Sequence, residues 1–170
     1  YCSPGKSERN NFKFNMDAYI LKRPSILIAN DDGIFADGIY ALWEAMSDIG
    51  ETTVVAPNTE KSAVGHAITI SDPIRIEKVN RSGGFRGYAV NGTPADSVKI
   101  AVKAIMDKKP DIIISGINAG ANIGQSLLYS GTISAATEGT FLGIPSIAIS
   151  LDSIRGGDWS GAKIVAKKVV

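Results

Sequence analysis

Two adjacent carboxylates stand at the end of a short apolar run near the start of the sequence. Residues 25–30 read SILIAN, a pattern typical of a buried parallel strand, and Asp31, Asp32 and Gly33 follow directly. Two like charges held together at a strand end are costly unless a cation offsets them, and a hard divalent ion would do so. The structural alternative is that Asp31 caps the next turn and that Asp32 is solvated.

A glycine-rich segment, GINAGANIGQSLLYSGT, follows the apolar run DIIIS and ends where a helix is expected. Glycines let backbone N–H groups approach an anion, and hydroxyls at a helix start add donors, so phosphate is the expected ligand. The predicted phosphate contacts are Gly116, Asn118, Ser130, Gly131 and Thr132. No lysine follows, so neither a P-loop nor a dinucleotide fingerprint is supported, and a turn that only caps the helix is the alternative.

A polar loop over residues 58–65 follows the second apolar strand and should open on the same sheet edge as Asp31. Its Ser62 can offer a hydroxyl to an ion. Ser62 and His66 are also the residue types of a hydrolase triad, but the sequence has no GxSxG elbow, and a lone histidine here is more often structural.

The segment TPAD most simply starts a helix, with Thr93 as its cap and Asp96 in its first turn. A contact from this segment to a base or ribose is a secondary alternative.

Composition narrows the classes of function. Lys and Arg total 18 against 17 for Asp and Glu, which argues against polymeric nucleic acid or an acidic membrane surface as a partner. A single histidine and a single cysteine exclude a zinc site built from several such ligands and leave oxygen ligands.

The lone Cys2 fits a reducing compartment, so a cytoplasmic location is predicted. No apolar run reaches the roughly 18 residues of a membrane span.

The remaining patterns alternate between strands and helices. Helices are expected over residues 37–49, 94–106, 132–141 and from 159, and strands over 52–56, 111–115 and 146–150. Residues 68–79 and 85–90 alternate around a polar turn and predict a hairpin or edge ribbon rather than more parallel sheet. These patterns predict an α/β fold: a doubly wound, Rossmann-like, mostly parallel sheet with helices on both faces and a β-hairpin insertion.

The two ends of the sequence fall outside this alternation. Residues 1–24 are polar and irregular and are interpreted as an extension or leader, whereas residues 25–170 are predicted to be a single α/β domain. The final AKIVAKKVV has the pattern of an unfinished helix, so the C-terminal part of the domain is expected to be absent.

Several long motifs, in order, resemble the survival protein SurE family of nucleotidases. They are ILIANDDGIFADGIYAL, VVAP, KSAVGHAIT, VNGTPADSV, PDIIISGINAGANIGQSLLYSGTISAATEG and LGIPSIAIS. The resemblance runs from about residue 25 to residue 151.

The resemblance implies a metal-dependent nucleotidase that binds one divalent ion per subunit, magnesium or manganese, through Asp31, Asp32, Ser62 and Asn118. Its expected reaction is hydrolysis of nucleoside 5′-monophosphates, with 3′-monophosphates and short polyphosphate as further candidates. Asp31 and Asp32 are the predicted catalytic residues, with Asp31 the preferred general base. A homodimer or homotetramer is also implied. The alternative from another class is a non-catalytic nucleotide- or phosphate-binding module.

Overall fold

A computed structural model describes residues 23–153 and 157–170. The leader predicted for residues 1–24 lies, up to residue 22, outside these described residues. The strands are β1 (Ser25–Ala29), β2 (Glu51–Pro57), β3 (Ile76–Asn80), β4 (Arg86–Val90), β5 (Ile112–Ala119) and β6 (Ser146–Leu151). The helices are α1 (Asp37–Ser47), α2 (Pro94–Ile100), α3 (Gly131–Phe141) and α4 (Ser160–Val169).

The strands form one six-stranded sheet in the order β3-β4-β2-β1-β5-β6, and only the β3–β4 pair is antiparallel. From β1 the chain moves outward through β2 and β4, and it then returns to the other side of β1 through β5 and β6. The direction of winding therefore reverses between β1 and β5. In doubly wound sheets this switch point, at the carboxyl ends of the strands, is where ligands bind.

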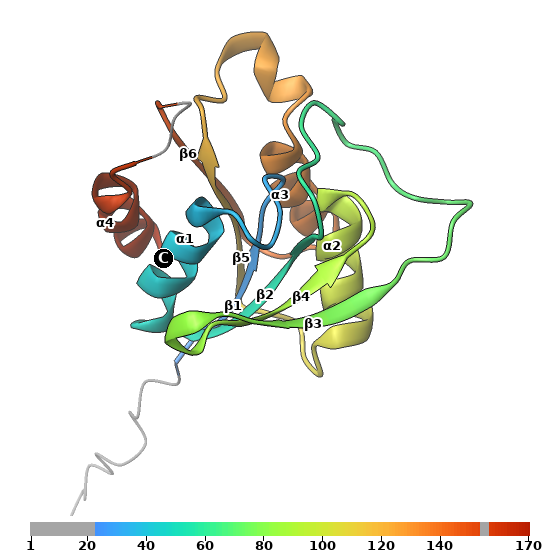
Figure 1. Cartoon of the computed structure of the whole chain (residues 1–170), viewed down its shortest axis with the longest axis horizontal. Helices are drawn as coiled ribbons and strands as arrows, with labels where there is room; N and C mark the ends of the chain where they lie inside the picture. The colour runs from blue at the N-terminus through green and yellow to red at the C-terminus, as the bar shows by residue number, and fades with distance from the viewer. Residues whose placement is uncertain (1–22, 154–156) are drawn as a thin grey trace, which may run out of the picture.

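Helices cover both faces of the sheet, as the sequence predicts (Figure 1). Alternate residues of β1 point to opposite faces: Ile26 and Ile28 pack in the core beneath α1 and α4, and Leu27 and Ala29 pack in the core beneath α2 and α3. The side chains of these four residues are fully buried. Burial on both sides explains why the strand reads as a continuous apolar run.

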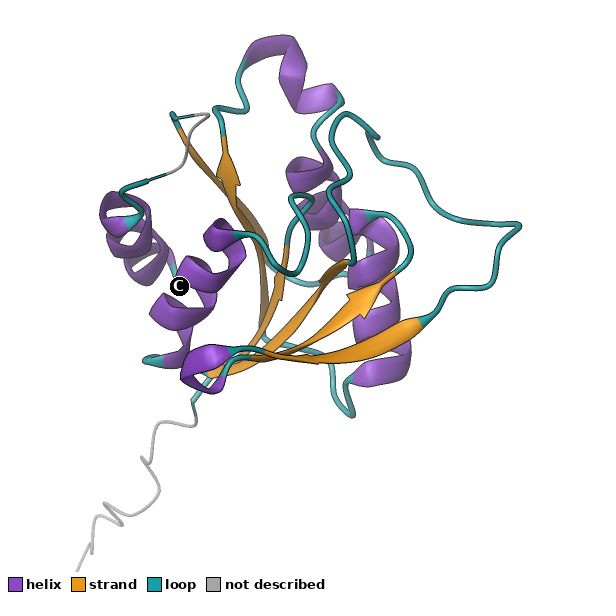
Figure 2. Ribbon diagram, in the orientation of Figure 1, coloured by secondary structure: helices purple, strands orange, loops and turns teal. Residues whose placement is uncertain are grey.

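The strand expected over residues 68–79 forms only at Ile76–Asn80, and the prediction for its first half is wrong. Residues 70–75 instead make a long excursion from the body of the protein (Figure 2), in which Ile70 is 85% exposed. The alternation of Ile68 and Ile70 suggested a strand, but no neighbouring strand pairs with it, and Pro73 has no N–H to donate to a ladder.

The hairpin prediction is only partly right. β3 and β4 pair antiparallel as expected, but β4 also pairs in parallel with β2 and belongs to the main sheet. Only β3 forms an antiparallel edge.

The helix predicted over residues 94–106 is present as α2 followed by a π-helical turn at Ala101–Ile105. The glycine-rich segment begins differently from expectation, because β5 continues through Gly116 to Ala119, with an irregular register against β6 between Ser115 and Asn118. A 3-10 turn at Gly124–Leu128 then leads to α3, which starts at Gly131. Within the described residues, no helix combines the length and apolar character needed to cross a membrane.

Candidate metal and phosphate site

The switch point brings together the ends of β1 and β5. Asp31 and Asp32 follow β1, and Asn118 is the next-to-last residue of β5. The N–H of the last residue, Ala119, donates to Asp32 Oδ2 at 3.4 Å. The acidic pair and the beginning of the glycine-rich segment therefore meet at one edge of the sheet. This proximity is what the strand pattern predicts.

Asp31 is almost buried, at 7% exposure, and lies at the N-terminus of α3. The Thr132 hydroxyl donates to Asp31 Oδ1, and backbone groups of Gly131 and Thr132 also hydrogen-bond to this carboxylate. Burial raises the pKa of Asp31 above its ordinary value, although these hydrogen bonds act in the opposite direction. The start of α3 thus stabilises the charged form of Asp31, which burial disfavours.

Glycine is required at position 131 by the approach of Asp31. A Cβ added to Gly131 would lie 2.6 Å from Asp31 Cβ and 2.9 Å from Asp31 Oδ2. Immediately before it, Ser130 caps the helix, since its hydroxyl oxygen accepts from the Ile133 N–H at 3.2 Å. Ser130, Gly131 and Thr132 therefore surround Asp31 and the start of α3, and their contact with phosphate remains a prediction.

Asp32 is partly buried beside Asp31 and has the more strongly perturbed carboxyl. Burial, the neighbouring Asp31 charge and, more weakly, Glu60 raise the pKa of Asp32 to about 6, while the Ala119 N–H lowers it. Among residues 23–153 and 157–170, neither carboxylate forms an ion pair with a positively charged side chain. Glu60 had no signal in the sequence beyond its place in the polar loop.

The loop that carries Ser62 is attached to the backbone at Asp31. The Lys61 N–H donates to the Asp31 carbonyl at 2.8 Å, and the exposed Ser62 hydroxyl donates to the Glu60 carboxylate. The residue after Ser62, Ala63, has a φ of 54°, in the left-handed region that few non-glycine residues adopt. The loop therefore keeps a defined path next to the acidic pair.

Asn118 is the predicted fourth ion ligand. Its side-chain amide nitrogen donates to the Gly120 carbonyl at 2.7 Å, which directs the Oδ1 oxygen away from that contact. Gly116 has a reason to be glycine that involves no ligand, because a Cβ there would lie 2.4 Å from the Ile149 carbonyl oxygen. Phosphate binding by Gly116 remains a prediction.

His66 does not pair with Ser62. Its Nε2 lies 3.0 Å from Glu138 Oε2, and its ring stacks on Phe141 with a centroid separation of 5.3 Å. The Ser62 hydroxyl donates to the Glu60 carboxylate instead, so the structure does not show the Ser–His hydrogen bond that a triad requires. Glu138 was missed by sequence reasoning, although it is the only charged residue in α3 and so could have been noticed there.

The donor set at the switch point fits a hard divalent ion. Nowhere in residues 23–153 or 157–170 do three or more His, Cys, Asp or Glu side chains gather as a group able to hold a metal. A site at Asp31 and Asp32 must therefore complete its coordination with neutral oxygens, which Ser62 and Asn118 can supply. Carboxylate, hydroxyl and amide oxygens are ligands of Mg²⁺ and Mn²⁺ rather than of softer metals.

The fold and this edge define the protein as a doubly wound α/β protein with an acidic, oxygen-lined site at its switch point. The chain belongs to the Survival protein SurE family, whose model matches residues 26–170. The resemblance seen in the sequence motifs is thereby confirmed.

The similar proteins are nucleotidases by name. The chain is 52% identical over 151 residues to the 5′-nucleotidase SurE of Syntrophobacter fumaroxidans, covering 84% of this chain and 60% of that protein. It is 54% identical over 137 residues to the 5′-nucleotidase SurE of Nitratidesulfovibrio vulgaris, covering 80% and 51%. The crystal structure of the SurE protein from Aquifex aeolicus superposes with a TM-score of 0.78 at 41% identity, covering 86% of this chain and 58% of that one. The chain thus spans between half and 60% of the length of these relatives.

Proposed function

We propose that this protein is a divalent-metal-dependent phosphomonoesterase that hydrolyses nucleoside 5′-monophosphates to nucleoside and phosphate. One observation carries the proposal: two partly or wholly buried carboxylates, both with raised pKa, adjoin each other at the switch point. A cation would offset the charge of the two carboxylates. Two similar proteins, 52% and 54% identical over the aligned residues, are named 5′-nucleotidase SurE.

The ion would be held by Asp31, Asp32, Ser62 and Asn118, as one Mg²⁺ or Mn²⁺ per subunit. When bound, such an ion lowers the pKa of a coordinated water and offsets charge on phosphate oxygens. Asp31 is the proposed general base. The donors from Thr132 and Gly131 fix its orientation, so a proton taken from the attacking water would arrive at a carboxylate that is already positioned.

The start of α3 is the proposed phosphate site. The hydroxyls of Ser130 and Thr132, the amides at Gly131 and Thr132, and the neighbourhood of Gly116 and Asn118 supply the donors that the sequence predicts. Because the Gly131 and Thr132 groups already hydrogen-bond to Asp31, we propose that their donors are shared between that carboxylate and the equatorial oxygens of the phosphoryl group.

Phosphate release tests the proposal directly. Purified protein is assayed with a panel of 5′- and 3′-nucleoside monophosphates and short polyphosphate, each with manganese, magnesium or a chelator. Release from 5′-monophosphates that depends on metal is expected. No release with any metal, together with measurable nucleotide binding, would identify the non-catalytic binding module instead, and activity that survives chelation would favour a serine hydrolase.

Two wider predictions accompany this function. Residues 25–170 are proposed to act as one nucleotidase domain, and assembly into a homodimer or homotetramer is supported by the apolar side chains that α4 exposes, among them Ile164 at 56% and Val165 at 52%. Light scattering after size exclusion measures the assembly. The cytoplasmic location stays a prediction from the lone cysteine.

A further inference from the structure

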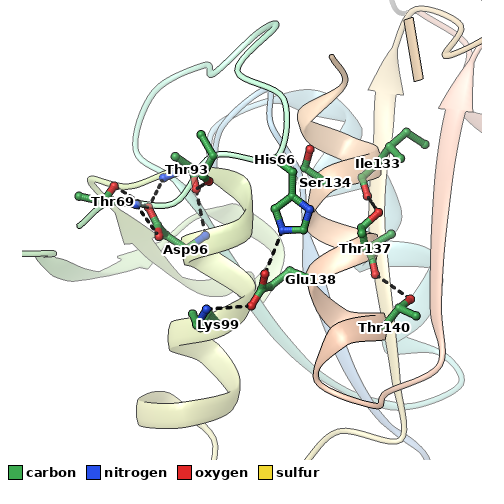
Figure 3. A network of polar contacts seen from close by, with 12 residues as sticks. His66, Thr69, Thr93, Asp96, Lys99, Ile133, Ser134, Thr137, Glu138 and Thr140 are labelled. Atoms are coloured by element: carbon green, nitrogen blue, oxygen red, sulfur yellow. Dashed lines mark hydrogen bonds and ion pairs between the residues drawn. The ribbon is translucent and has the colours of Figure 1, made fainter. Parts of the chain in front are cut away.

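Four residues just after the Ser62 loop, His66–Thr69, are fastened to two helices, and we call them the anchor segment. Figure 3 shows His66 pointing toward Glu138 of α3, and Thr69 facing Asp96 of α2. The middle of the anchor segment is also held, because the Thr93 hydroxyl donates to the Ala67 carbonyl at 2.8 Å. The chain then leaves for the exposed excursion of residues 70–75.

Glu138 is the centre of the first attachment. Its side chain is 6% exposed, and its two oxygens have different partners: Oε2 lies 3.0 Å from His66 Nε2, and Oε1 lies 3.3 Å from Lys99 Nζ of α2. A buried carboxylate is tolerated only when it is paired, so Glu138 is matched to these two groups. Phe141 stacks on the His66 ring at an interplanar angle of 15° and restricts its orientation.

Asp96 makes the second attachment. It is 2% exposed and accepts from the Thr69 N–H at 3.1 Å and from the Thr69 hydroxyl at 2.6 Å. Asp96 also completes a capping box with Thr93, so the helix start itself is rigid. The anchor segment is therefore tied to α3 at its first residue, His66, and to α2 at its last residue, Thr69.

The segment between the anchor and the acidic pair has fewer attachments. The Lys61 N–H donates to the Asp31 carbonyl at 2.8 Å, and the Gly65 N–H donates to the Tyr129 carbonyl at 3.1 Å. Ser62 lies between these two contacts on an exposed stretch. Its place relative to Asp31 depends on how firmly the chain is held on its far side, at His66.

We propose that Glu138 is a positioning residue, which fixes His66 and thereby holds the Ser62 loop against Asp31 for ion binding. The consequence for the ion rests on the proposed function, while the effect on the loop does not. Neither Glu138 nor His66 touches the ion or substrate in this assignment.

The test compares three variants of the full chain by amide hydrogen exchange without metal and by calorimetric titration with Mn²⁺. His66→Ala removes the contact at a side chain that is 29% exposed, so the fold should survive. Glu138→Gln keeps an oxygen that can accept from His66 Nε2–H and serves as the conservative rescue. Lys99→Met is the matched control, because it removes the other partner of Glu138 and leaves His66 in place.

In His66→Ala, hydrogen exchange at the Lys61 and Gly65 amides is expected to accelerate by about tenfold. The exchange rate of the core Ile113 amide, which donates to the Pro145 carbonyl, should not change. The dissociation constant for Mn²⁺ is expected to rise by about tenfold in the same variant. Glu138→Gln and Lys99→Met should stay close to the parent protein in both measurements.

Unchanged exchange at Lys61 and Gly65, or equal acceleration at Ile113, would overturn the proposal. Faster loop exchange with unaltered Mn²⁺ affinity would also overturn it, since the loop would then be irrelevant to the ion. An effect of Lys99→Met as large as that of His66→Ala would assign the result to charge balance at Glu138 and not to the contact. If the parent protein binds no Mn²⁺, the proposed function fails, and the exchange data still decide whether the His66 side chain holds the loop.

Discussion

Two buried aspartates lie at the starts of neighbouring helices and meet opposite conditions. Asp96, at the start of α2, accepts hydrogen bonds from the backbone of Thr93 and from the backbone and hydroxyl of Thr69. Asp31, at the start of α3, accepts from Thr132 and Gly131 but adjoins Asp32, whose pKa is raised to about 6. A buried carboxylate at a helix start is thus by itself a structural device. The second, uncompensated carboxylate is what indicates a ligand.

The largest expected effect separates the two aspartates by activity. Asp31→Asn keeps the shape of the side chain and the oxygen that accepts from Thr132, but it removes the base and one charge from the ion site. We expect metal-dependent phosphate release to fall by about three orders of magnitude with the thermal unfolding midpoint preserved. The control is Asp107→Asn. Asp107 is an exposed aspartate near the residues that begin β1 and β2, at the opposite end of these strands from Asp31, and its replacement should leave activity unchanged. Near-normal turnover by Asp31→Asn would contradict the assignment.

Asp96→Ala should show the reverse pattern. It leaves partly buried donors at Thr69 and Thr93 without an acceptor, and we expect the free energy of unfolding to fall by about 2 kcal/mol. Urea denaturation measures this loss, with Asp96→Asn as the milder control because one acceptor oxygen remains. A stable Asp96→Ala protein would show that water replaces those contacts and that the two aspartates are less different than described.

Asp32→Asn tests whether the acidic pair is costly without metal. The folded-state pKa of Asp32, about 6, is above the ordinary value near 4 of the unfolded chain, so ionisation opposes folding. The cost is absent below about pH 4, grows between pH 4 and 6, and is complete above pH 6. In chelator at pH 7.5 the variant should therefore be more stable than the parent by about 1–2 kcal/mol, an amount reduced by solvent screening.

At pH 4 the two proteins should unfold at the same temperature. Saturating Mn²⁺ should stabilise the parent more than the variant and so reverse their order at pH 7.5. Equal midpoints in chelator at every pH would remove the electrostatic argument for a bound cation.

The smallest expected effect concerns the Ser62 loop, which runs from the Lys61 contact with Asp31 toward the Thr69 contact with Asp96. Ala63→Gly relieves a left-handed backbone conformation but loosens the unfolded chain, so the free energy of unfolding should change by less than about 1 kcal/mol. Exchange at the Lys61 amide is the sharper measurement, and it should increase. A large loss of stability would mean that the Ala63 methyl group packs in a way that its exposure does not indicate.

Local patterns predicted most of this fold. The run ending at Ala29, the helical spacing from Asp37 and the cap at Thr93 each determine their own element through burial or hydrogen bonding within a few residues. Ile68 and Ile70 alternate like a strand, yet they stay exposed because pairing depends on a partner that the pattern cannot supply. β5 continues through Gly116 for a similar reason: β6 lies alongside it.

The candidate site was predictable as far as chain order allowed. Asp31, Asp32 and Asn118 follow strands that become neighbours, so their meeting follows from parallel-sheet topology. Glu60 and Glu138 act across tertiary contacts, one on the charge at Asp32 and one on His66. No spacing along the chain encodes such contacts.

The excursion of residues 70–75 has a consequence for limited proteolysis. With Ile70 85% exposed on a segment outside the sheet, a protease that accepts branched apolar residues should nick the described part of the native protein there. The cut would fall beyond Thr69, so the fragment that ends there keeps its attachments to Asp96 and Glu138. The two pieces should then migrate together until they are denatured, as a nicked protein that retains its acidic pair and its Ser62 loop.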